Sequence, residues 1–472
     1  TAVTDPLFES TAASALVAEL VDFAAACRLD FATSLVAESA SESVCPPSVG
    51  GECALGTDVL EDRKEEFEFF APEGDPDAPD IPTPPSYAEA IEGPYSSQWQ
   101  AAMDAKMASW KVKRPSGFPP VFKARYVARG FSQRQGVDFF QTFSPTPKMT
   151  TLRVLLHVAA HRDYELHSLE FSTAFLQGSL HEEIWLRRPP GFTGSFPAGT
   201  QWSLRRPVYG LRQAPREWHD TLRTTLAALG FAPSTADPSL FLRTDTTLPP
   251  FYVLVYVDDL VFATADTEAL AHVKSELQKR HTCTDVGELT SYLGLRITRD
   301  RAQRTITLIQ SHMVQQVLQR FGFTYSSPQS TPLPTGHSLS APPSDVSVEP
   351  SGPSSCEAEI YAGAMAAQEL RWLTYLLTDL GEAPHSPPVL YVDNKAMLAL
   401  CQEHRLEHRT KHIALRYFLA RELQQRGQLR LAYVASQANT ADVFTKALQP
   451  CDHQRFCTVL GLVPTVPHLL TS

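Results

Sequence analysis

Phe251-Tyr-Val-Leu-Val-Tyr-Val-Asp258-Asp259-Leu260 is the stretch that decides the fold of this 472-residue chain, because two apolar arms flank two adjacent carboxylates. The aromatic and β-branched left arm predicts a buried strand. Leu260-Val-Phe-Ala263 predicts the returning strand, so Asp258 and Asp259 occupy the tight connection of a hairpin. Two carboxylates in such a place repel each other and lose hydration. A divalent cation such as Mg²⁺, which prefers oxygen ligands, would compensate them. An ordinary Asp-rich turn is the alternative.

Charge is distributed unevenly along the chain. Residues 1–100 hold 20 Asp and Glu against 3 Lys and Arg, a balance of −17, whereas the whole chain has a net charge of −11. The remaining residues therefore carry an excess of +6, which suits contact with nucleic acid. Residues 1–85 include a segment rich in Pro and Asp, and we expect them to form an acidic, largely disordered linker or tail.

Composition places the chain among globular intracellular proteins. A hydrophobic content of 43% is enough for packed cores, and the length allows two to four domains. The sequence shows no signal peptide and no apolar run near 18 residues, and its eight cysteines lack paired CxxC spacing. These features favour reduced thiols and no membrane partner.

A basic strand is predicted within residues 122–133. Basic and apolar residues alternate there, as on a half-buried strand. Lys123, Arg125 and Arg129 could then face one side and meet phosphate groups. A strand face with solubilising cations is the alternative interpretation.

The Tyr-Val-Asp-Asp string at 256–259 resembles the signature hairpin of reverse transcriptases, and further strings follow in the order of one family. Phe143-Ser-Pro-Thr-Pro-Lys148 and the segment 208–218, with its Tyr-Gly-Leu-Arg-Gln run, resemble motifs of copia-type polymerases. The chain is thus identified as a member of the copia-type LTR retrotransposon Pol polyproteins, as a degenerate copy. The resemblance implies an α+β fold, with the antiparallel sheet and helices of a polymerase palm and fingers and the start of a thumb, over residues 86–325.

The resemblance also assigns the metal site. Asp258 and Asp259 would hold two Mg²⁺ ions together with a third carboxylate, which is an Asp in the family and Glu170 here. Glu is longer by one methylene, and a two-metal site holds its ions only about 3.5–4 Å apart. A misplacement of about 1 Å can lower a rate on the order of 100-fold. The substitution therefore threatens activity more than fold.

Substrate-binding residues are implied in the same way. The incoming triphosphate would meet the basic residues of the predicted strand, Lys123, Arg125 and Arg129. Phe175 would disfavour ribose, and Gln213 would pack against the incoming nucleotide and the template. Gly294 lies in a string that resembles the hairpin that grips the primer end, where a glycine permits close approach of nucleic acid. An ordinary hairpin glycine is the alternative.

A second block, residues 356–450, resembles the ribonuclease H domain fused to copia-type polymerases. Its matching carboxylates are Glu359 on a predicted helix, Asp393 at a strand end and Asp442 at the start of the last helix. The family's fourth carboxylate and the strands around it have no counterpart, so we expect an incomplete α/β domain. A Pro/Ser-rich linker at 326–355 marks the apparent deletion, and residues 451–472 would form a C-terminal tail.

The function implied is that of an RNA-directed DNA polymerase, which adds deoxynucleoside triphosphates to a primer on an RNA or DNA template, with a ribonuclease H remnant. Its place would be a cytoplasmic particle or the nucleus. One alternative is a catalytically inactive relic that at most binds nucleic acid through its basic surface. Another is a chain with internal deletions that never folds compactly. Glu170 and the missing nuclease carboxylate favour the relic.

Overall fold

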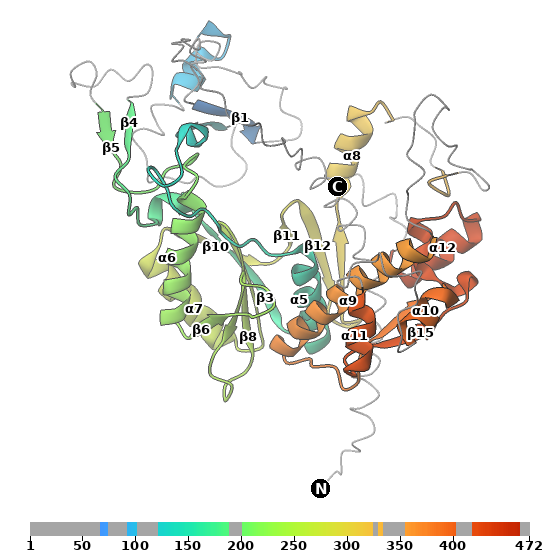
Figure 1. Ribbon diagram of the computed structural model, residues 1–472. Helices are drawn as coiled ribbons and strands as arrows, with labels where there is room; N and C mark the ends of the chain where they lie inside the picture. Colours follow the sequence, from blue (N-terminus) through green and yellow to red (C-terminus); the bar gives the residue numbers. More distant parts are fainter. Residues whose placement is uncertain are drawn as a thin grey trace, which may run out of the picture.

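The computed structural model describes residues 67–73, 92–101, 121–187, 201–323, 329–333, 355–402 and 418–462. Up to residue 323 these form an N-terminal lobe, and from residue 355 a C-terminal lobe (Figure 1). Helices are mixed with antiparallel sheets, as the α+β class predicts. Most of residues 1–85, where the sequence predicts a linker or tail, lie outside the described residues.

A six-stranded antiparallel sheet forms the centre of the N-terminal lobe. Its order is β10-β3-β9-β8-β7-β6. The strands are β3 (Glu165–Phe171), β6 (Phe231–Pro233), β7 (Leu240–Arg243), β8 (Phe251–Tyr256), β9 (Asp259–Thr264) and β10 (Cys283–Glu288). The hairpin read from the sequence is β8 and β9, in the middle of the sheet, and both arms are almost wholly buried. Both faces of the sheet must therefore be covered.

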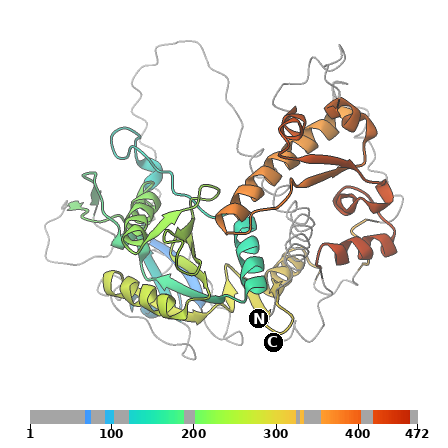
Figure 2. The same ribbon diagram turned by 90° about the horizontal axis from the view of Figure 1, so that it is seen from below.

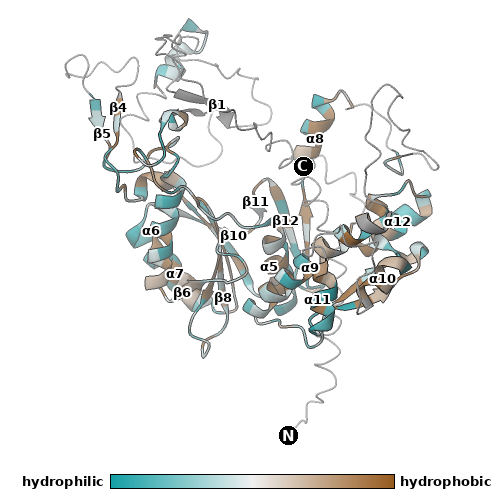
Figure 3. Cartoon of the chain, in the orientation of Figure 1, coloured by the Kyte–Doolittle hydropathy of each residue, from teal (hydrophilic) through white to brown (hydrophobic). Residues whose placement is uncertain are grey.

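Two helices cover one face of this sheet. They are α6 (Ala214–Ala228) and α7 (Thr267–Arg280), which pack Trp218, Leu222 and Leu277 against the strands. The opposite face is covered by α5 (Met149–Arg162) and by the small sheet of β11 (Ser291–Tyr292), β12 (Leu295–Asp300) and β13 (Thr305–Ile309). We call these the α6 face and the α5 face. Figure 3 colours parts of the central strands as hydrophobic, in agreement with burial from both sides.

The remaining elements of the N-terminal lobe lie around this centre. They are β1 (Phe67–Glu73), β2 (Val121–Tyr126), η1 (Gly130–Ser132), η2 (Ala174–Gln177), β4 (Trp185–Arg187), β5 (Gln201–Ser203) and α8 (Ser311–Arg320). Strand β1 pairs with β2 but belongs to residues 1–85, where the sequence predicts a linker or tail. Its phenylalanines have high strand propensity, which a composition averaged over 85 residues hides.

The C-terminal lobe is built on two parallel strands and four helices of the described chain. Its elements are α9 (Ser355–Asp379), β14 (Val389–Val392), α10 (Lys395–Gln402), α11 (Leu419–Gln425), β15 (Arg430–Tyr433), η5 (Ser436–Ala438), η6 (Thr440–Phe444) and α12 (Pro450–Val459). The segment after Asn439 is a short 3₁₀ turn rather than the start of the last helix. The last helix of the described residues is α12, within the expected tail, and begins where Pro450 suits a first helical position.

Helix α9 belongs to the cores of both lobes. Its first half packs Ile360 and Ala367 among the buried residues of the C-terminal lobe. Its second half packs Leu373, Leu376 and Leu377 onto the α5 face of the central sheet. Figure 2 shows α9 running from the C-terminal lobe to α5. One helix thus joins the two lobes by burial at each end.

Polar contacts fix the second half of α9 in place. The Asp379 carboxylate accepts hydrogen bonds from the Ser234 hydroxyl, at 2.6 Å, and from the backbone N–H groups of Thr235 and Ala236. The buried Tyr252 hydroxyl donates to the Leu380 carbonyl at 2.7 Å. Arg162 forms a two-pronged ion pair with Glu382 just beyond the helix. No described helix of the chain is both long enough and apolar enough to cross a bilayer.

Candidate active site

The connection between β8 and β9 is one residue earlier than the sequence predicts. Tyr256 pairs with Asp259, so Val257 and Asp258 are the two turn residues and Asp259 is the first residue of β9. Val257 has a φ of 55°, a left-handed conformation that a β-branched residue rarely adopts. Such strain persists only where the surroundings impose it, and it gathers at functional sites.

Two hydrogen bonds to carbonyl groups impose this turn. The indole N–H of Trp218, on α6, donates to the Val257 carbonyl at 2.6 Å. The backbone N–H of Phe171 donates to the Asp258 carbonyl at 2.7 Å. The Phe171 and Trp218 rings also meet edge to face, with centroids 4.8 Å apart. The aspartate pair is therefore held by α6 from one side and by the end of β3 from the other. The only sequence signal for Trp218 in this position was its place in the motif at 208–218.

Glu170 lies opposite Asp259 in the central sheet. The two residues are direct partners in the antiparallel pairing of β3 and β9, and directly opposed residues send their side chains to the same face. Leu166 and Val261 of these strands belong to the α5 face, and side chains alternate along a strand. Glu170, Asp259 and Tyr256 therefore all project to the α5 face. Two acidic residues from separated parts of the sequence thus lie side by side at one end of the sheet, with Asp258 in the adjoining turn.

The donor chemistry of this group suits Mg²⁺, whereas its present side-chain geometry does not form a finished site. Carboxylate oxygens are the ligands that Mg²⁺ prefers. Glu170, Asp258 and Asp259 are all half-buried. Among the described residues, however, no three His, Cys, Asp or Glu side chains come close enough to hold one ion. The side chains of Glu170, Asp258 and Asp259 would have to rotate to bind one ion.

The segment that carries Arg129 is held by an unusually close backbone crossing. The Ala128 N–H donates to the Tyr209 carbonyl at 2.8 Å. A Cβ added to Gly130 would lie 1.9 Å from the Gly210 carbonyl oxygen, and one added to Gly210 would lie 2.1 Å from the Ala128 carbonyl oxygen. Only glycine fits at both positions. The crossing fixes the half-buried Arg129 beside the loop that leads to α6.

Two other predicted substrate residues lie near this crossing. The Phe175 ring, on η2, packs against the Tyr209 ring with centroids 4.8 Å apart. Gln213 precedes α6 and is fully buried, with its amide bonded to the Gln133 side chain and to the Asp138 carbonyl. In this structure Gln213 positions the segment 133–138, and its burial leaves no surface for the nucleotide contact that the sequence predicts.

Lys123 and Arg125 lie two residues apart on β2, so they share one face of that strand. They face Phe70 and Glu68 of β1 in the strand pairing. The exposure and contacts of these two side chains lie outside what the structure describes. Their phosphate contact stays a prediction.

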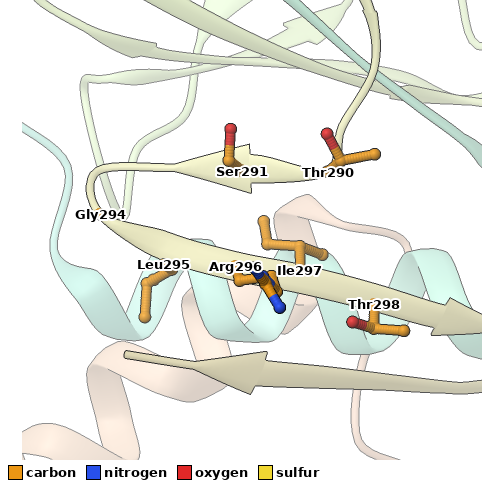
Figure 4. Close-up of a pocket in the computed structure, with 7 residues that line it drawn as sticks. All are labelled: Thr290, Ser291, Gly294, Leu295, Arg296, Ile297 and Thr298. Atoms are coloured by element: carbon orange, nitrogen blue, oxygen red, sulfur yellow. The ribbon is translucent and has the colours of Figure 1, made fainter. Parts of the chain in front are cut away.

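Gly294 lies at the turn of the hairpin that joins β11 and β12. Leu293 and Gly294 have φ values of 48° and 77°, and nothing lies within 4 Å of a Cβ added to Gly294. An open pocket of about 510 Å³ lies against this hairpin. Figure 4 shows its lining, with Thr290 and Ser291 at β11, Gly294 at the turn and residues 295–298 on β12. The glycine is thus accessible, as a nucleic-acid contact requires.

The acidic residues of the C-terminal lobe are grouped around a lysine that the sequence analysis did not single out. The Lys446 ammonium lies 2.7 Å from an Asp442 oxygen and 3.8 Å from an Asp393 oxygen. Its hydrogen bond to Asp442 raises the pKa of Lys446, and the nearby Asp393 and Glu359 add to this effect. The spacing of Asp442 and Lys446, four residues apart, was the available signal.

Comparison with known proteins agrees with this geometry. Residues 108–335 match the reverse transcriptase (RNA-dependent DNA polymerase) family. The chain is 29% identical over 453 residues to a retrovirus-related Pol polyprotein from transposon RE2 of Arabidopsis thaliana, with 73% of this chain and 31% of that protein covered. It is 32% identical over 279 residues to the corresponding polyprotein from transposon TNT 1-94 of Nicotiana tabacum, with 54% and 21% covered. A putative Ty5-1 transposon protein of Saccharomyces cerevisiae is 36% identical over 129 residues, covering 27% of this chain and 42% of that protein.

The extent of these matches adds two facts. The chain spans less than a third of the length of the two plant polyproteins. The match to RE2 extends over 453 residues. It includes 73% of this chain, or about 345 of its 472 residues. Roughly 110 positions of that polyprotein therefore have no counterpart in this chain. The family match and the paired carboxylates coincide on one sheet. Residues 108–335 therefore match the reverse transcriptase family, and the chain is similar to the Pol polyproteins of copia-type transposons.

Proposed function

We propose that this chain extends a primer on an RNA or DNA template by two-metal nucleotidyl transfer, within a polymerase domain at 86–325. The observation that carries the proposal is the placement of Glu170 opposite Asp259, next to a strained turn that presents Asp258. The family that residues 108–335 match supports the same reaction.

Each residue has a defined task in this proposal. Asp258, Asp259 and Glu170 hold two Mg²⁺ ions, which supply the positive charge that activates the primer hydroxyl and stabilises the leaving oxygen. Trp218 keeps the turn in the geometry that presents Asp258. Phe175, packed on Tyr209, excludes a ribose hydroxyl. The basic residues of the segment 123–129 bind the triphosphate of the incoming nucleotide.

Primer extension on an RNA template with Mg²⁺ tests this function. We expect extension by the full chain, its loss in Asp258→Asn, and no change in the control Glu268→Gln, an exposed carboxylate on α7. Glu170→Asp should raise the rate up to about 100-fold, because it restores the shorter reach for which a two-metal site is spaced. Extension that survives in Asp258→Asn would contradict the assignment of the site.

A second candidate function is binding of nucleic acid without catalysis. It is favoured by Glu170, whose extra methylene displaces a ligand, and by the roughly 110 positions that the chain lacks relative to RE2. In this case neither the wild type nor Glu170→Asp extends a primer. Binding to a primer–template duplex would still weaken as salt rises, with the slope set by the number of phosphates contacted.

We further propose that residues 356–450 are a ribonuclease H remnant, joined through a linker at 326–355. Support comes from the grouping of Glu359, Asp393 and Asp442 around Lys446. Cleavage of the RNA strand in an RNA–DNA hybrid, measured with Asp442→Asn as the control, would separate a working remnant from an inactive one. Both proposed activities place the protein inside the cell.

A further inference from the structure

Tyr292 is a buried residue whose polar end the fold leaves unused. It ends β11, two residues before Gly294, and its side chain is 6% exposed. Ser291 before it is exposed and lines the pocket, so alternation along the strand turns Tyr292 inward. Among the described residues, its hydroxyl has no hydrogen-bond partner.

A buried hydroxyl without a partner loses the hydrogen bonds that it made to water. Tyr252, another buried tyrosine of this face, avoids that loss, since its hydroxyl donates to the Leu380 carbonyl. Phenylalanine would fill the Tyr292 position with the same ring and no such penalty. A hydroxyl at this position therefore points to a hydrogen-bond partner that approaches it when a neighbouring side chain moves.

The position of the hydroxyl identifies that partner. Tyr292 belongs to the packed cluster of the α5 face, and Tyr256 packs against the same cluster. Tyr256 is paired with Asp259, and Asp259 projects to this face opposite Glu170. Burial raises the pKa of Tyr292, and the charges of Asp259 and Asp258 raise it further, which places both carboxylates near its ring. The phenol therefore remains a hydrogen-bond donor at any ordinary pH.

We propose that Tyr292 is a positioning residue of the polymerase site: its buried hydroxyl donates a hydrogen bond to the Asp259 carboxylate when that side chain rotates to hold an ion. The inference rests on the proposed function, because it concerns the same carboxylates. The same hydrogen bond would help to bring together the carboxylates of the site, which are not yet close enough to hold one ion. The donor is carried by the hairpin of Gly294, so a primer seated on that hairpin would set the orientation of the carboxylate.

The test compares Tyr292→Phe with Tyr252→Phe. Mg²⁺ affinity is measured by titration calorimetry on the full chain, and stability by thermal unfolding without Mg²⁺. Tyr292→Phe should bind Mg²⁺ about tenfold more weakly, as expected for a lost hydrogen bond to a charged group, and should unfold at the same or a higher temperature. Tyr252→Phe should unfold at a lower temperature with unchanged Mg²⁺ affinity, because it leaves the Leu380 carbonyl without its donor.

The outcomes separate the inference from the function on which it rests. Equal Mg²⁺ affinity in the wild type and Tyr292→Phe, with binding lost in Asp258→Asn, would overturn the role of Tyr292 and leave the metal site standing. Wild-type protein that binds no Mg²⁺ would overturn both. A lower unfolding temperature in Tyr292→Phe, with Mg²⁺ affinity unchanged, would assign the hydroxyl to the fold instead.

Discussion

Lys446 shows what a single residue does to an acidic cluster. Its ammonium lies between Asp442, which is 6% exposed, and Asp393, so the carboxylates are compensated without a metal. Lys446 itself is half exposed, so solvent screens its ion pair with Asp442. The ammonium of Lys446 thus supplies positive charge to this group of carboxylates.

Lys446→Met should therefore destabilise the C-terminal lobe by about 1–2 kcal/mol at neutral pH, less than the 3–5 kcal/mol of a fully buried pair. Urea unfolding measures the loss. Millimolar Mg²⁺ should restore part of the stability of the variant and leave the wild type unchanged. A variant that is insensitive to Mg²⁺ would show that the three carboxylates do not take an ion.

Gly210 is a second residue whose effect can be isolated. Its φ is 87°, and an added Cβ would lie 2.1 Å from the Ala128 carbonyl oxygen. Gly136 has a similar φ of 81° but nothing within 4 Å of its Cβ position. Gly136→Ala should lose about 1–3 kcal/mol from backbone strain alone. Gly210→Ala should lose at least about 1–3 kcal/mol more from the clash, measured by urea unfolding. Equal losses would contradict the close crossing.

At the scale of elements, α9 stabilises the central sheet as well as its own lobe. Leu376 is fully buried among residues of the α5 face, whereas its neighbour Tyr375 is 51% exposed. Leu376→Ala should destabilise the N-terminal lobe by about 2–5 kcal/mol through lost burial and a cavity. Tyr375→Ala should change stability by no more than about 0.5 kcal/mol. Hydrogen exchange of amides in β8 and β9 reports on the sheet directly, and unchanged exchange in Leu376→Ala would contradict the shared core.

Elements with strong apolar patterns could be predicted from the sequence, and long-range partners could not. The bounds of α7, and the arms of the central hairpin, follow from local periodicity. The predicted turn was displaced by one residue, because only the cross-strand pairing of Tyr256 with Asp259 shows where the turn lies. Gln213 was expected to pack against the incoming nucleotide and the template, whereas in the structure it is buried and bonded to Gln133, 80 positions earlier in the chain. Such contacts leave no periodic trace in a sequence.

At the scale of the whole molecule, half-buried histidines make stability depend on pH. Burial lowers the pKa of His167, His219 and His281, so the folded protein binds fewer protons than the unfolded chain. Their contribution is complete above the ordinary histidine pKa of about 6.5 and is lost as the pH falls through that value toward the lowered ones. The N-terminal lobe should therefore unfold at a lower urea concentration at pH 5.5 than at pH 7.5.

His281→Gln should reduce this difference, because the substitution removes one titrating group between the Phe171 and Trp218 rings. The control is His272→Gln, at an exposed position of α7, which should keep the wild-type difference. Burial acts in the opposite sense on Glu217, whose pKa it raises, but that effect belongs to more acidic solutions near pH 4.5. A midpoint that does not change between pH 7.5 and 5.5 would show that the histidines are hydrated in the folded protein.

The continuity of α9 has a consequence for how the two acidic centres relate. Glu359 and Leu376 lie 17 residues apart in one helix, a span of about 26 Å at 1.5 Å per residue. Because a helix does not stretch, α9 holds Glu359 at a constant distance from the α5 face on which Leu376 packs. Under the two proposed activities, a hybrid made at the polymerase site would reach the nuclease site at Glu359 after a constant number of base pairs, because α9 has a constant length.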